Sequence, residues 1–253
     1  TAEVLAGSTV SGTIPAGETW GGSPITKRGV AGESWPSCTP QEIGAGTLTG
    51  LEKPLNGLIE RLLYNGGLLV VRFLQIVSMS PGFVLVYPQV ASIEVYEEVF
   101  PRLLLWIPAF TILMAATWLA GVAVVIRLLS VMIRPGFYSS HSAVAAAVWL
   151  THVIMQRTLI STYPIYASGF TPAWLRLLGA RIGKNVEIST VETIPHLTWI
   201  RDNSFLADHS SASTTRHSSH WVHIGTTVIG ERSFVGNSGI VGPDQDVPDD
   251  SLI

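Results

Sequence analysis

The sequence predicts a membrane α-helical hairpin combined with a left-handed parallel β-helix of hexapeptide repeats, as a fragment of a larger chain. Three observations predict this fold class. Only 13% of the 253 residues are charged, whereas an ordinary soluble domain carries about 25%. Two long apolar stretches occupy the middle of the chain, and an aliphatic residue recurs at every sixth position toward the C-terminal end.

The two apolar stretches are each long enough to cross a bilayer. Residues 62–87 carry a single charged side chain, Arg72, and residues 103–126 carry none. About 20 apolar residues span the hydrocarbon core as a helix. We therefore predict two transmembrane helices within residues 58–134, with the lipid bilayer as a partner and a multi-pass location in the cell membrane.

Charge asymmetry predicts the orientation of this hairpin. Residues 88–101, between the two stretches, carry Glu94, Glu97 and Glu98 and no basic residue, while basic residues flank the outer ends: Lys53, Arg61, Arg127 and Arg134. Positively charged flanking segments stay on the cytoplasmic side. We expect both termini and the repeat domains to be cytoplasmic and the acidic loop to be external.

The six-residue period is strongest in Ile229-GERSF, Val235-GNSGI, Val241-GPDQD, Val247-PDDSL and Ile253. In a hexapeptide β-helix each repeat forms one short strand and a corner, and three repeats complete one coil. Residues 182–253 are predicted to begin such a domain. The same period in residues 1–22 predicts the closing turns of a preceding β-helix domain. Residues 23–57 are predicted to be a linker, and residues 135–181 interfacial helices.

The period fails between Leu206 and Ile229, which predicts a loop that leaves the coil and returns. Loops on a regular scaffold commonly carry function, and this stretch holds four histidines: His209, His217, His220 and His223. A histidine near its ordinary pKa can act as a general base. We take His217 and His220 as the first catalytic candidates, followed by His209. Asp208 could orient an imidazole or hold an ammonium group. The alternative is a polar loop without chemistry.

Two further patterns have competing interpretations. The spacing of the four histidines matches no common zinc site, so no metal is expected. The acidic tail, Asp244, Asp246, Asp249 and Asp250, could attract a cationic substrate or consist of solvated coil corners. The net charge of −3 argues against a nucleic-acid partner, since no basic face is available to release counterions.

Several segments resemble the membrane-embedded C-terminal region of ε-poly-L-lysine synthetase and related terminal regions of nonribosomal peptide synthetases. The segments are Tyr163–Thr190, Phe205–Asp208 and Phe234–Gly239, with Gly12–Pro24 similar to the closing turns of a preceding repeat domain. The family tends to have an acidic residue where this chain has His209. The resemblance assigns no catalytic residue.

The resemblance implies amide-bond formation between carrier-bound aminoacyl thioesters and a growing homopolymer such as ε-poly-L-lysine. It implies a phosphopantetheine thioester delivered by a carrier domain, and ATP used by an adenylation domain, both outside this chain. Expected partners are the carrier domain, other repeat domains of the synthetase and an amino-acid substrate, and a homo-oligomer stays open. Two alternatives remain: a hexapeptide acyltransferase that uses coenzyme A, and a non-catalytic scaffold that docks a carrier domain.

Overall fold

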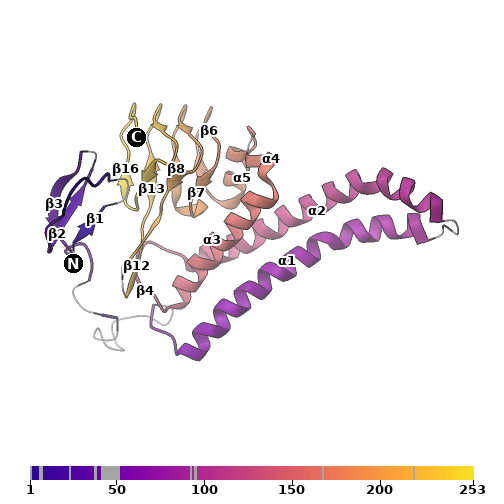
Figure 1. The fold of residues 1–253 in the computed structure, drawn as a ribbon, viewed down its shortest axis with the longest axis horizontal. Helices are drawn as coiled ribbons and strands as arrows, with labels where there is room; N and C mark the ends of the chain where they lie inside the picture. The colour runs from indigo at the N-terminus through magenta and orange to yellow at the C-terminus, as the bar shows by residue number, and fades with distance from the viewer. Residues whose placement is uncertain are drawn as a thin grey trace.

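The computed structural model describes residues 2–5, 8–22, 24–36, 39–40, 52–91, 93, 96–166, 168–218 and 220–253. Figure 1 shows two long helices that extend as a hairpin away from a stack of short strands. The N-terminal strands and the C-terminal strand stack both lie at the same end of this hairpin. The end of α1 and the start of α2 lie at the opposite end of the hairpin.

The hairpin consists of α1 (Gly57–Ala91) and α2 (Tyr96–Met132), each of which extends beyond its predicted span at both ends. Small residues allow the two helices to approach closely. A Cβ atom added at Gly82 would lie 2.5 Å from the Phe110 ring, and one added at Gly121 would lie 2.9 Å from Leu74. Glycine at such contacts is typical of helix pairs in membranes.

A third helix, α3 (Ala143–Ser161), begins at the N-cap Ser142, whose hydroxyl accepts a hydrogen bond from the Ala145 N–H. By length and composition, α1, α2 and α3 are all apolar enough to cross a membrane. Half of the apolar stretch of α3 is buried within the protein, compared with 17% for α1 and 22% for α2. The sequence predicted interfacial helices in this region. In the structure α3 packs against both helices of the hairpin, and its place relative to the membrane stays a prediction.

The C-terminal part is a coil of short parallel strands, which the chain visits in rotation to build three sheets. The first sheet holds β5 (Arg181–Ile182), β8 (Thr198–Ile200), β13 (Thr227–Ile229) and β16 (Gln245–Asp246). The second holds β6 (Glu187–Ile188), β9 (Phe205–Leu206) and β14 (Phe234–Val235). The third holds β7 (Val191–Glu192), β10 (Ser210–Ala212) and β15 (Ile240–Val241).

Aliphatic side chains at the six-residue spacing fill the interior of this coil. Six of them are almost fully buried: Ile188, Ile200, Leu206, Ile229, Val235 and Val241. Their registers match, since Ile182 pairs with Ile200, and Ile188 with Leu206. The parallel strands agree with the predicted class, while the left-handed sense of the coil and its hexapeptide assignment remain predictions.

Short helices connect the coil to the hairpin. After α4 (Tyr163–Tyr166) comes α5 (Thr171–Leu178), whose buried residues include Trp174 and Leu175 and which packs against β5, β6 and the 3-10 helix Pro195–Leu197. Arg127 of α2 donates a hydrogen bond of 2.9 Å to the carbonyl of Leu177. A basic side chain at a helix C-terminus satisfies carbonyls that have no partner within the helix.

The interruption of the period is shorter and more regular than expected. Ser210–Ala212 still belongs to the coil as β10, and the chain then leaves it as β11 (Thr215–His217) and β12 (Trp221–Ile224). The strand β12 pairs antiparallel with both β11 and β4 (Gly136–Ser139). The histidine-rich insert is therefore a hairpin that joins a three-stranded sheet, and β4 lies in the region predicted to contain interfacial helices.

The N-terminal segment contains β1 (Glu3–Val4), β2 (Glu18–Gly21) and β3 (Thr26–Val30). The strand β1 pairs parallel with β2, and β2 pairs antiparallel with β3, which lies inside the predicted linker 23–57. Part of that linker, residues 41–51, lies outside the described residues. The domain boundaries given above remain predictions.

The N-terminal segment contacts the insert, and Arg216 makes several of these contacts. The Arg216 guanidinium lies 4.7 Å from the centroid of the Trp35 ring, 3.5 Å from the Glu3 carboxylate and 2.6 Å from the Ser34 hydroxyl. These contacts combine a charge pair with a cation–π interaction. The first and last parts of the chain therefore pack on each other.

Candidate functional site

A cavity of about 250 Å³, here called the inner cavity, lies where α3 and α4 meet the coil. From the helices it is lined by side chains that include His152, Met155, Leu159 and Tyr166, and from the coil by Glu192 and His209. Apolar walls with a few converging polar groups are typical of small-molecule sites. The inner cavity is therefore our candidate site.

Two charged or titratable groups face each other across this cavity. His152 comes from α3, and Glu192 from the end of β7. Glu192 and His217 lie close enough to His152 for their charges to act on its imidazole. Within the described part of the chain, no Lys or Arg forms an ion pair with Glu192. The Glu192 carboxylate is thus free to hold a cationic ligand.

The turn after β9 directs two consecutive side chains into different cavities. His209 has a φ of 55°, in the left-handed region, and its N–H donates a hydrogen bond of 2.7 Å to the Thr190 hydroxyl. The preceding residue, Asp208, accepts a hydrogen bond from the Ser189 hydroxyl. Asp208 lines a second cavity of about 590 Å³, here called the outer cavity, and His209 lines the inner one.

Tyr166 lines both cavities and forms part of the wall of each. Its side chain is 1% exposed, and the hydroxyl accepts a hydrogen bond of 2.9 Å from the Trp174 indole N–H. Burial raises the pKa of Tyr166 to about 12. The phenol therefore stays protonated at neutral pH and contributes a neutral wall to both cavities.

The two leading sequence candidates lie on the inserted hairpin. His217 ends β11, and partial burial lowers the pKa of its imidazole. His220 is exposed in the β11–β12 turn, and its carbonyl accepts a hydrogen bond from the Ser140 N–H. Neither side chain lines the inner cavity, although His217 is near His152. Their predicted catalytic role stays a prediction.

The fourth histidine of this stretch, His223, contacts neighbouring side chains of the protein. The His223 Nε2 atom lies 2.9 Å from the Asp244 carboxylate, and the ring stacks on Phe137 with centroids 4.5 Å apart. Burial lowers the pKa of His223, although the Asp244 carboxylate acts in the opposite direction. These contacts fasten the insert to the coil.

Sequence reasoning missed His152 and Glu192 as site residues. His152 lies in the apolar helix α3, and Glu192 ends the short strand β7. The two positions are distant in the sequence, and only the packing of α3 on the coil brings them to one cavity. No local spacing signal could have found this pair.

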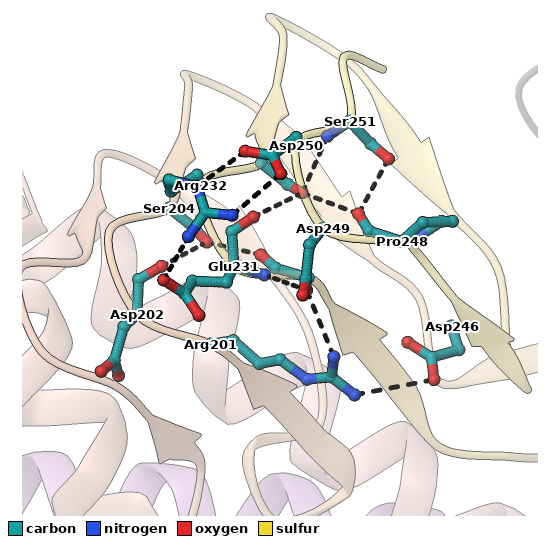
Figure 2. Close-up of polar contacts among 12 residues, drawn as sticks. Arg201, Asp202, Ser204, Glu231, Arg232, Asp246, Pro248, Asp249, Asp250 and Ser251 are labelled. Atoms are coloured by element: carbon teal, nitrogen blue, oxygen red, sulfur yellow. Dashed lines mark hydrogen bonds and ion pairs between the residues drawn. The ribbon is translucent and has the colours of Figure 1, made fainter.

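The acidic tail forms a network with the protein itself, as Figure 2 shows for three of its carboxylates. Asp246 and Asp249 lie 3.8 and 3.2 Å from the Arg201 guanidinium, and Asp250 lies 2.7 Å from that of Arg232. Asp244, outside that view, contacts His223 and accepts a hydrogen bond from the Thr226 N–H. Each tail carboxylate thus has a protein partner, which favours the role of coil corners over a cation trap.

Asp side chains at these corners also bind backbone N–H groups one coil away. Asp202 accepts from the Lys184 N–H, and Asp249 accepts from the Glu231 N–H, in each case 18 residues apart.

In the described ranges, no three His, Cys, Asp or Glu side chains are grouped as a metal site requires.

Comparison with known proteins gives a single line of support. No family model and no solved structure matches the chain. The chain is 27% identical over 253 residues to delta-poly-L-ornithine synthetase of Acinetobacter baumannii (strain AB307-0294). The match covers 95% of this chain and 18% of that protein, so the chain spans less than a fifth of the relative's length. This homology supports the expected relationship to synthetases of the poly-amino-acid type.

Proposed function

We propose that this chain is a membrane-embedded part of a poly-amino-acid synthetase, and that amide bonds form in its inner cavity. The observation that carries the proposal is the convergence of His152, Glu192 and His209 on one cavity between a candidate membrane helix and the coil. The homology to a protein named as a poly-ornithine synthetase supports the reaction class.

The reaction requires an activated acyl group and a neutral amine. An aminoacyl thioester, carried on a phosphopantetheine arm and formed with ATP elsewhere in the synthetase, supplies the activated carbonyl. Met155 and Leu159 give the inner cavity an apolar wall that fits such an arm. The product is a homopolymer of an amino acid that bears a second amine, with ε-poly-L-lysine and poly-ornithine as the leading cases.

The residues of the inner cavity have the chemistry that this step needs. Glu192 holds the incoming amine as its ammonium, which releases one proton to solvent. An imidazole, His152 or His209, then removes a second proton from the neutral attacking nitrogen. The nitrogen then forms a bond to the thioester carbon, the carbon–sulfur bond breaks, and the proton returns to the departing thiolate. General-base assistance of this kind contributes about 10² to 10⁴ in rate.

The two alternatives are less well supported. An acyltransferase that uses coenzyme A needs basic side chains for the coenzyme phosphates. Three arginines of the coil and its insert, Arg201, Arg216 and Arg232, are already engaged with carboxylates, and the other basic side chains of the coil are Arg181 and Lys184. A pure scaffold would not require His152 and Glu192 in the same cavity. Embedding in the cell membrane with both termini cytoplasmic belongs to this proposal and rests on the charge asymmetry.

The test uses the full-length synthetase and follows carrier loading and polymer formation separately. We expect His152→Ala, His209→Asn and Glu192→Gln each to reduce polymer formation while loading persists, with at least one histidine variant losing about 10² or more. His141→Ala is the matched control, since His141 pairs with Glu60 and does not line the inner cavity. Wild-type polymer yield from all three variants would overturn the proposal in favour of the scaffold.

A further inference from the structure

The outer cavity has a composition unlike that of the inner one. Its volume is about 590 Å³, and its lining includes Tyr163, Tyr166, Glu187, Ser189, Phe205 and Asp208. Its described lining contains two carboxylates, three aromatic rings and no Lys or Arg. Such a surface matches a cationic, partly apolar ligand in charge.

The aromatic side of this cavity is held in place by stacking. The Phe205 ring lies parallel to that of Phe234, with centroids 5.4 Å apart and 6° between the planes. Phe205 remains 38% exposed. Because one ring face is supported by Phe234, Phe205 offers a fixed aromatic surface, and aromatic rings attract ammonium groups within about 6 Å.

The acidic side is fixed from the neighbouring coil. The Ser189 hydroxyl donates a hydrogen bond to the Asp208 carboxylate. Glu187 lies two residues before Ser189 in the chain, and its side chain is exposed. No Lys or Arg of the described chain forms an ion pair with either carboxylate. Both acids are therefore available to a ligand, unlike the acidic tail.

The two cavities are linked through shared and adjacent residues. Tyr166 lines both, and the consecutive residues Asp208 and His209 line one each. A ligand bound to Asp208 in the outer cavity thus lies next to His209, which lines the inner cavity. The volume of the outer cavity falls in the range of sites for drug-sized ligands. This volume is larger than a single amino acid requires.

We infer that the outer cavity binds the growing polymer through its ammonium groups, so that the terminal amine is presented to the inner cavity. This inference rests on the proposed function. Glu187 and Asp208 bind ammonium groups of the acceptor, and Phe205 covers its apolar parts. The outer cavity is thus an acceptor subsite, and the inner cavity holds the reacting thioester.

The experiment uses the full-length synthetase with 1,4-diaminobutane as the probe, because it carries two ammonium groups and no carboxylate. Its competition with polymer formation is measured for the wild type, Glu187→Gln, Phe205→Leu and the double variant. We expect each single variant to need about fivefold more probe for half inhibition, and to release shorter polymers. High salt should weaken the inhibition of the wild type, because exposed charge pairs are screened.

The matched control is Asp246→Asn, which removes a coil carboxylate that does not line either cavity. It should leave both inhibition and polymer length unchanged. Absence of inhibition in the wild type, or equal inhibition and equal polymer length in all variants, would overturn the inference. The inference would also be overturned if the variants needed more free monomer but made polymers of unchanged length, because the outer cavity would then bind monomer.

Failure of this inference can be separated from failure of the proposed function. Full polymer yield from the inner-cavity variants contradicts the proposed function. Loss of polymer in those variants, together with unchanged behaviour of Glu187→Gln and Phe205→Leu, contradicts only the acceptor subsite. Carrier loading reports that the adenylation and carrier domains are intact, and the protease resistance of the coil reports that the substituted region is folded.

Discussion

The Ser189 hydroxyl donates a hydrogen bond to the Asp208 carboxylate from the adjacent coil. The next pair repeats the relationship, since the Thr190 hydroxyl accepts from the His209 N–H. Two neighbouring positions on one coil therefore fix two neighbouring site residues on the next. The first bond orients the Asp208 side chain, and the second holds the backbone from which the His209 side chain projects.

The first prediction concerns this support. Ser189→Ala removes the hydrogen bond that orients Asp208 and should reduce polymer formation by about three- to tenfold. This is less than the ~1.5–3 kcal/mol of a hydrogen bond to a charged group, because water can replace the hydroxyl beside this exposed carboxylate. Protease resistance of the coil should be unchanged. Ser251→Ala is the control, because the Ser251 hydroxyl donates its hydrogen bond to the nearby Pro248 carbonyl. An unaltered rate in Ser189→Ala would show that Asp208 needs no orientation.

The second prediction concerns the interior of the coil. Val235 is 1% exposed, and Val235→Asp would place an unpaired charge among aliphatic side chains. Such burial costs several kcal/mol, so the coil should lose its resistance to protease. Asn237→Asp is the control at an exposed position two residues away, where a change within about 0.5 kcal/mol is expected. Equal tolerance of both substitutions would contradict the interior register.

The third prediction concerns the packing of α1 on α2. A methyl group at Gly82 would lie 2.5 Å from the Phe110 ring, so Gly82→Ala should destabilise the hairpin by about 1–3 kcal/mol through overpacking. Thermal unfolding in detergent measures the effect. Gly66→Ala is the matched control on the same helix, because a methyl group there meets no atom within 4 Å. It should be neutral or stabilising by up to about 1 kcal/mol.

The fourth prediction concerns pH. Burial lowers the pKa of His223, which packs against Phe137 and Trp35 and faces Asp244 and Arg216. The unfolded chain, with a histidine pKa of about 6.5, then binds more protons than the folded chain below that pH. Stability should therefore be unaffected above about pH 7 and fall as the pH drops through 6.5.

His223→Gln should reduce this pH dependence, because the substitution removes the titrating group and retains a polar side chain. The free energy of unfolding, measured at pH 7.5 and pH 5.5 in detergent, tests the effect. Burial also lowers the pKa of His196 and His217, so part of the dependence should remain. A variant with the same pH profile as the wild type would contradict the role assigned to His223.

The fifth prediction concerns orientation in the membrane. Glu97 lies at the start of α2, at the end of the hairpin far from the coil, and Asp246 lies in the coil. A cysteine at position 97 should react with an impermeant thiol reagent added outside cells, and one at position 246 should react only after permeabilisation. The opposite pattern would reverse the predicted orientation and move the inner cavity outside.

The long helices and the parallel coil could be predicted from the amino-acid sequence alone. Their signals are local or periodic: an uncharged run such as residues 103–126, and aliphatic residues such as Ile229, Val235 and Val241 that are buried at a fixed spacing. The homology to a poly-amino-acid synthetase likewise agrees with the resemblance of residues such as Phe205–Asp208. These features do not depend on which distant segments meet.

The residues that form the cavities could not be predicted in this way, because they come together only through tertiary packing. The histidine-rich insert attracted attention because its residues are close in sequence, yet it folds as a hairpin on β4, with His220 in an exposed turn. His152 and Glu192 carry no shared pattern, and they meet because α3 packs between the hairpin and the coil. The same holds for the Arg216 contacts with Glu3 and Trp35. Helix and strand periods are properties of a few consecutive residues, whereas a cavity is formed by the packing of surfaces far apart in the chain.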